Sequence, residues 1–142
     1  MSFKQIQMFN VGPKLFEFTI DGIPVQALKM SSSRSSIWGM YKQHKAKVAI
    51  DIATQFNYEK INHAVHLQVD FLLPIPSTLE SNDIREEEEP HLKEPTTGNL
   101  IRFVEEALLD SIFEDIVTIP SICAVKYYSS NPKTTISIYH LE

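Results

Sequence analysis

The stretch EPTTGNLIRFVEEAL, residues 94–108, sets the fold of this chain. It joins a turn signal, Thr-Thr-Gly, to apolar residues that recur every three or four positions, beginning with Leu100 and Phe103. That spacing predicts an amphipathic helix over residues 99–113, with one face in a core and with Asn99 as its N-cap. No carboxylate stands at the N-terminal edge of this helix, and the absence bears on what chemistry the chain can do.

Alternating apolar and polar residues predict strands on both sides of this helix. Residues 14–21 and 63–73 each place every second side chain on a core face. Residues 119–130 and 134–142 follow the helix as two strands joined by Ser-Asn-Pro-Lys, which predicts a C-terminal hairpin. Helical spacing recurs over residues 36–56. The order strand, helix, strand, loop, helix, strand, strand predicts an α+β fold, with two main helices packed on a small mixed β-sheet.

Size and composition fit a single domain over residues 1–142. No apolar run approaches the roughly 18 residues that a membrane span needs, and the first residues lack the apolar core of a signal peptide. The one cysteine, Cys123, excludes an internal disulfide and a cysteine metal cluster. We therefore expect an intracellular protein, nuclear or cytoplasmic, with no membrane contact.

The formal charge of −5 is concentrated in one segment, residues 77–98, which holds seven acids and two bases. A polar segment of this length predicts a disordered acidic loop within the domain. Its charge also suits a dock for a basic partner, or a mimic of nucleic acid that covers a basic surface.

A basic stretch lies between Asp21 and Asp51, where the sequence has no acid at all. Its cations either lie on a solvated helix face or neutralise the phosphates of a nucleic acid. The lack of balancing acids favours the second interpretation, whereas the neutral body of the chain counts against it. Five residues are the candidate nucleic-acid contacts of this stretch: Lys29, Arg34, Lys42, Lys45 and Lys47.

The sequence resembles the RusA-like Holliday-junction resolvases over nearly the whole chain. The motif that carries the resemblance lies around the central helix. The motif of that family reads roughly Pro-Asp-x-Asp-Asn-Leu-x-Lys, then Asp-Ala-Leu, then a pair of aspartates and a strand lysine. Arg102 keeps the charge of the motif lysine, and Glu106 stands for the aspartate of Asp-Ala-Leu. The resemblance implies a RusA-like fold, a homodimer and a branched DNA substrate. The positions that match or keep the charge are Pro95, Asn99, Leu100, Arg102, Glu106, Ala107, Leu108 and Lys126.

The departures from the motif fall on its acids. Thr96 and Gly98 stand where the family has two metal-binding aspartates, and Ile116 stands for the second aspartate of the later pair. In the family these side chains hold magnesium for phosphodiester hydrolysis. The resemblance therefore predicts a degenerate metal site, with no catalytic residue and no cofactor. Glu106 and Asp115 are the residual acids, and we expect magnesium only if they form a site of their own.

Two residues beside the altered positions have two interpretations each. Asn99 either only caps its helix or retains a phosphate contact at the helix N-terminus. Arg102 either meets a phosphate or pairs with the neighbouring glutamates. Lys126, at the strand lysine of the motif, joins them as a candidate nucleic-acid contact.

The sequence leaves three functions open. The first is a catalytically degenerate RusA-like scaffold or interaction subunit, with a protein partner, in a nucleic-acid-associated complex. The second is a non-cleaving binder of branched DNA. The third is an active magnesium-dependent Holliday-junction endonuclease with a rearranged site. The three altered acidic positions favour the first, because they imply that selection for cleavage has ended.

Overall fold

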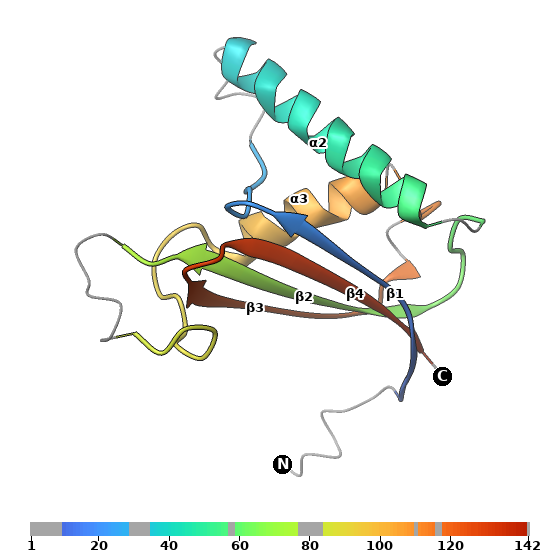
Figure 1. Ribbon diagram of the computed structural model, residues 1–142. Helices are drawn as coiled ribbons and strands as arrows, with labels where there is room; N and C mark the ends of the chain where they lie inside the picture. Colours follow the sequence, from blue (N-terminus) through green and yellow to red (C-terminus); the bar gives the residue numbers. More distant parts are fainter. Residues whose placement is uncertain are drawn as a thin grey trace.

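The fold is a four-stranded mixed sheet with two helices on one of its faces (Figure 1). The computed structural model describes residues 10–28, 35–56, 59–76, 84–109, 111–115 and 118–141. In chain order the elements are β1 (Val11–Asp21), α2 (Ser35–Gln55), β2 (Val65–Pro74), α3 (Thr97–Leu109), β3 (Ser121–Ser129) and β4 (Lys133–Leu141). This order and the position of the helices confirm the predicted α+β class.

The strands lie in the order β1-β4-β2-β3. β4 pairs antiparallel with both β1 and β2, whereas β2 and β3 are parallel, so the sheet is mixed. The predicted C-terminal hairpin is therefore wrong, because β2 lies between β3 and β4. The short connection 130–132 is long enough to cross the end of β2, since neighbouring strands lie only about 4.8 Å apart. An alternating pattern identifies a strand but does not identify its neighbours.

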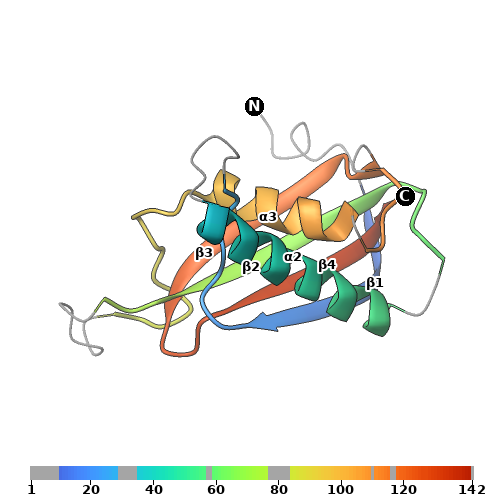
Figure 2. The same cartoon turned by 90° about the horizontal axis from the view of Figure 1, so that it is seen from above.

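The core lies between the sheet and the two helices. β2 buries Val65, Leu67, Val69 and Phe71 on its helix-facing side, as the alternation predicts. α3 buries one complete face, and it lies on the sheet while α2 crosses toward β1 (Figure 2). The buried residues of α3 are Leu100, Phe103, Val104, Ala107 and Leu108. The central helix thus has the buried face that its sequence predicts.

Part of the acidic segment extends the sheet at the edge of β3. The backbone N–H of Glu87 donates to the carbonyl of Tyr128 (2.8 Å), and the N–H of Tyr128 donates to the carbonyl of Glu89 (3.2 Å). The N–H of His91 donates to the carbonyl of Lys126 (3.1 Å). Disorder therefore stays a prediction for residues 77–83, which lie outside the described part of the chain.

No helix in the described ranges is both long and apolar enough to cross a membrane.

His91 is buried where the acidic segment meets β3. Its side chain is 8% exposed, and its ring centroid lies 4.8 Å from that of Tyr128. Burial, followed by the positive charge of Lys126, lowers the pKa of His91 below its ordinary value of 6.5, and Lys93 acts in the same direction through its charge. The carbonyl of Lys93 opposes this shift. The unfolded chain therefore binds the His91 proton more readily than the folded chain does.

We predict that folding stability falls as pH drops below about 6.5, because protonation of His91 then favours the unfolded state. The contribution is complete above pH 6.5 and is lost as the pH falls through the lowered pKa of the folded state. Urea unfolding at pH 7.5, 6.5 and 5.5 measures this slope. His91→Gln should flatten the slope, whereas Leu92→Gln, an exposed neighbour that does not titrate, should leave it unchanged. Equal slopes in the parent chain and His91→Gln would contradict the assignment.

Candidate functional site

The N-terminus of α3 is capped by Thr96. The backbone N–H of Asn99 donates to the hydroxyl oxygen of Thr96 (3.2 Å), and the N–H of Leu100 donates to its carbonyl (3.1 Å). The helix therefore begins at Thr97, and the prediction that Asn99 is the N-cap is wrong. Both residue types cap helices well, so the sequence alone does not choose between two caps three residues apart. Asn99 instead accepts a hydrogen bond at its carbonyl from the N–H of Ala27 (2.9 Å).

Gly98 lies exposed in the first turn of α3, with open space around it. A Cβ atom built on Gly98 would have no neighbour within 4 Å. Packing therefore does not require glycine here, and glycine costs a helix about 1 kcal/mol relative to alanine. The space would accept an aspartate, and glycine supplies no side-chain oxygen of its own.

Lys126 connects β3 to the turn that precedes α3. Its ammonium donates to the carbonyl of Lys93 (2.5 Å) and to the carbonyl of Pro95 (2.8 Å). These two bonds fix the chain just before the Thr96 cap. One N–H of the ammonium remains for another acceptor, because lysine has three donors. A nucleic-acid contact by Lys126 stays a prediction.

Glu106 lies between α3 and α2. The hydroxyl of Tyr41 donates to Oε2 of Glu106 (2.8 Å), and the ammonium of Lys45 lies 3.7 Å from the same oxygen. Burial raises the pKa of Tyr41 to about 12, and the hydrogen bond to Glu106 acts in the same direction. Tyr41 thus stays a neutral donor, and Glu106 serves as its acceptor in the contact between the two helices.

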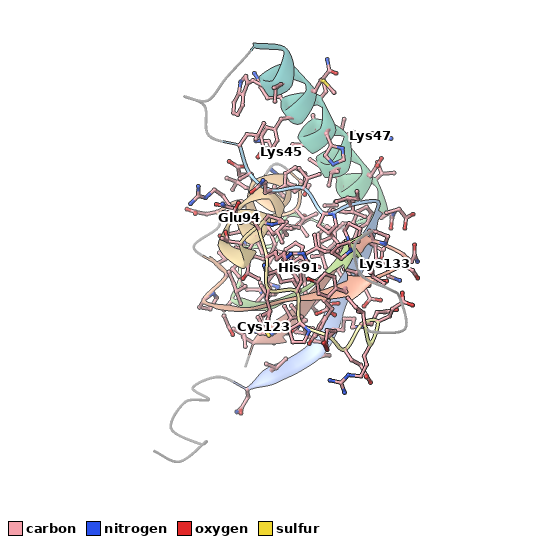
Figure 3. The ribbon with its side chains drawn as sticks, turned by 90° about the vertical axis from the view of Figure 1, so that its left-hand side faces the viewer. Lys45, Lys47, His91, Glu94, Cys123 and Lys133 are labelled. Atoms are coloured by element: carbon pink, nitrogen blue, oxygen red, sulfur yellow. The ribbon has the colours of Figure 1, made fainter. Side chains whose placement is uncertain are left out.

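The candidate cations do not lie in one row. Lys45 and Lys47 point to opposite sides of α2 (Figure 3). This follows from helix geometry, since two residues turn an α-helix by about 200°. Lys42 is exposed, while Lys29 and Arg34 lie outside the described residues. Each lysine contact with nucleic acid stays a prediction, and one phosphate strand could not meet Lys45 and Lys47 together.

The sequence matches the model of a known protein family. The family model described as "Endodeoxyribonuclease RusA" matches residues 28–139. The chain belongs to the RusA family. Membership carries a nucleic-acid-related function of the Holliday-junction-resolvase type, and it confirms the resemblance seen in the sequence. No curated protein matches the chain.

Of the other RusA motif positions, Arg102 and Asp115 are on the surface and Ile116 lies outside the described residues. Arg102 is exposed, and its charge opposes the rise in the pKa of Glu105 that burial causes. Asp115 is exposed, and its carbonyl accepts hydrogen bonds from the N–H (3.2 Å) and hydroxyl (2.8 Å) of Thr118.

The side chains at these motif positions do not fit the magnesium that the RusA family implies. Magnesium takes oxygen ligands in near-octahedral geometry, usually one or two carboxylates with phosphate oxygens and waters. Here the Thr96 hydroxyl is the acceptor of a helix cap, Gly98 has no side chain, and Glu106 accepts from Tyr41. Within the described ranges, no three residues among His, Cys, Asp and Glu come together as metal ligands.

The sequence did not predict two of the contacts described above. The Tyr41–Glu106 hydrogen bond was missed because Tyr41 has the spacing of a core residue, and its ring is indeed buried. The only signal was a hydroxyl on an apolar stripe, which needs a partner when it is buried. The Thr96 cap was missed because Asn99 offered a second good cap in the same turn.

We predict that Thr96→Ala destabilises the folded chain by about 1 kcal/mol, because the alanine leaves the N–H of Asn99 without its acceptor. Asn99→Ala is the matched control, since the Asn99 side chain is not the cap, and it should cost clearly less. Thr96→Asp should be as stable as the parent chain, because aspartate also caps and suits the positive end of the helix dipole. Urea unfolding at neutral pH measures all three. A larger loss for Asn99→Ala than for Thr96→Ala would restore Asn99 as the cap.

Proposed function

We propose that this chain is a catalytically degenerate RusA-like protein that serves as an interaction subunit of a nucleic-acid-associated complex and does not cleave DNA. The observation that carries the proposal is the first turn of α3. There Thr96 is a neutral cap and Gly98 has no side chain, at the two positions where the RusA motif has aspartates.

The chemistry of phosphodiester hydrolysis explains why these two changes matter. Bound magnesium positions the attacking water and stabilises the charge that develops on the leaving oxygen. Carboxylates hold the ion because they supply negative charge as well as oxygen atoms. A threonine hydroxyl is neutral, and it already accepts a hydrogen bond from the N–H of Asn99. The fold is thus retained while the ligands that give it catalytic power are replaced.

A second candidate is a non-cleaving binder of branched DNA. Exposed Lys42 and Arg102 support it, as does the RusA family itself. The opposite directions of Lys45 and Lys47 count against a single phosphate track on α2. A gel shift with a four-way junction separates the candidates, because binding through several phosphates must weaken steeply with added salt. A homodimer remains an expectation from the family.

An active nuclease with a rearranged site has less support. It would need Glu106 and Asp115 to hold magnesium with few other carboxylates. Glu106 already accepts from Tyr41 and lies beside Lys45, so a metal ion would have to displace one contact and tolerate the nearby ammonium.

We predict that returning the motif acids restores metal binding. Thr96→Asp, Gly98→Asp and Ile116→Asp together should bind Mn²⁺ or Mg²⁺ and gain thermal stability with added metal, because Gly98 has room for the new side chain. The matched control carries Thr97→Asp, Asn99→Asp and Ile116→Asp, which add the same charge at neighbouring positions. Equal metal responses in the two variants, or none in a folded triple variant, would contradict the role given to these positions.

We also predict that the chain has a protein partner that does not depend on nucleic acid. Native purification from the source cells, with and without nuclease treatment, and mass spectrometry of the eluate measure this. An interaction subunit should retain the same partner in a fixed ratio in both samples. Loss of every partner after nuclease treatment would favour the DNA-binding candidate instead.

A further inference from the structure

β1 is an edge strand whose outer side has no strand partner among the described residues. It pairs only with β4, whereas the edge of β3 is covered in part by residues 87–91. Pro13 and Lys14 disfavour pairing of another strand at the start of β1, but residues 15–20 contain neither proline nor lysine. An open edge presents a row of backbone N–H and C=O groups that another extended chain can satisfy.

A groove follows this edge on the helix side of the sheet. One hollow of about 430 Å³ lies between residues 18–21 of β1 and the side of α2 that carries Lys47 and Asp51. A second hollow, of about 410 Å³, adjoins Leu15 and is walled by Phe56 and Ile61. The two hollows lie beside successive parts of the same strand. Side chains of an added strand that point toward the helices would therefore find space at both places.

The wall of the groove on α2 carries two exposed side chains of opposite charge. Lys47 and Asp51 are both exposed, and neither takes part in an ion pair within the described residues. Four residues of α-helix advance by about 6 Å. Alternate side chains of a β-strand are about 6.7 Å apart, so two of them can meet two helix residues with this separation.

We propose that the groove between β1 and α2 docks an extended segment of a partner protein, which adds to the edge of β1 as a further strand. The segment places an acidic side chain against Lys47 and, two residues later, a basic side chain against Asp51. A following apolar side chain enters the hollow beside Leu15. This assignment rests on the proposed function as an interaction subunit, and it names the surface that the subunit uses.

The order of the charges follows from strand direction. β1 runs antiparallel to α2 (Figures 1 and 2). A segment that pairs antiparallel with β1 therefore runs parallel to α2, and it passes Lys47 before Asp51. Addition of a strand to an open sheet edge is a common way to recognise peptides, in which backbone bonds give affinity and alternate side chains give specificity.

Other occupants fit the groove less well. A second copy that paired through its own β1 would present Phe16, Phe18 and Ile20 toward the helices, which offer no charge to Lys47 or Asp51. A nucleic acid would place phosphates beside Asp51 and Asp21, both of which line or border the same hollow. Mixed charge and an open backbone edge favour a polypeptide.

The test is a selection of random twelve-residue peptides, displayed on phage, against the full chain. Enriched peptides should share an acid-x-base pattern followed by an apolar residue. Lys47→Glu combined with Asp51→Lys should weaken the binding of synthetic copies of these peptides at least about fivefold, which corresponds to loss of two exposed ion pairs. Selection on this double variant should instead enrich base-x-acid. Lys42→Glu, an exposed lysine outside the groove, is the matched control and should change neither result.

Four results of the selection, binding and sedimentation experiments would overturn the proposal. They are a selection that enriches nothing, enriched peptides without the charge pair, peptides that bind the double variant as well as the parent chain, and a dimer in sedimentation that the double variant breaks. The last would make a second copy the occupant. A native partner that survives nuclease treatment and still binds the double variant would contradict the docking surface. It would leave the proposed function as an interaction subunit standing. Absence of any such partner would sink the proposed function instead.

Discussion

The ammonium of Lys126 reaches from β3 to the carbonyls of Lys93 and Pro95, and the start of α3 depends on this contact. It holds the turn in which Thr96 caps the helix. From that start α3 runs across the sheet and buries Leu100 and Leu108 in the core. Another side of α3 contacts α2 through the hydrogen bond between Tyr41 and Glu106. A strand lysine thus anchors the turn that precedes the central helix.

This dependence separates two properties that the RusA family normally joins. The lysine, the helix and the acid that meets α2 maintain the fold, and this chain retains all three. In our proposal the aspartates of the RusA motif at these two positions serve the metal, and Thr96 and Gly98, which replace them here, cost the fold little. Threonine caps the helix as aspartate would, and Gly98 faces open space. On the proposed function, the catalytic ligands were replaced without disturbing the scaffold, and the sheet edge and the outer side of α2 serve contacts with partners.

The sequence predicted what local patterns encode and missed what distant contacts decide. The alternation in β2 and the stripe of α3 identified the buried faces, because burial imposes those periods directly. The apolar stripe continues through Phe113, although α3 ends at Leu109, because Phe113 remains buried in the turn beyond the helix and bridges to Ile61. The hairpin failed because strand order is set by packing in the whole sheet. The motif comparison identified Thr96 as an altered position, and the structure showed that it caps α3.

We propose above that the fold was kept while the metal site was lost. Isothermal titration of the unmodified chain with Mg²⁺ and with Mn²⁺ tests it most directly, because the method needs neither a substrate nor a partner. We expect no stoichiometric binding of either ion, since Thr96 and Gly98, at the start of α3, supply no carboxylate. Tight binding with a fixed stoichiometry would contradict this proposal and would favour an active nuclease.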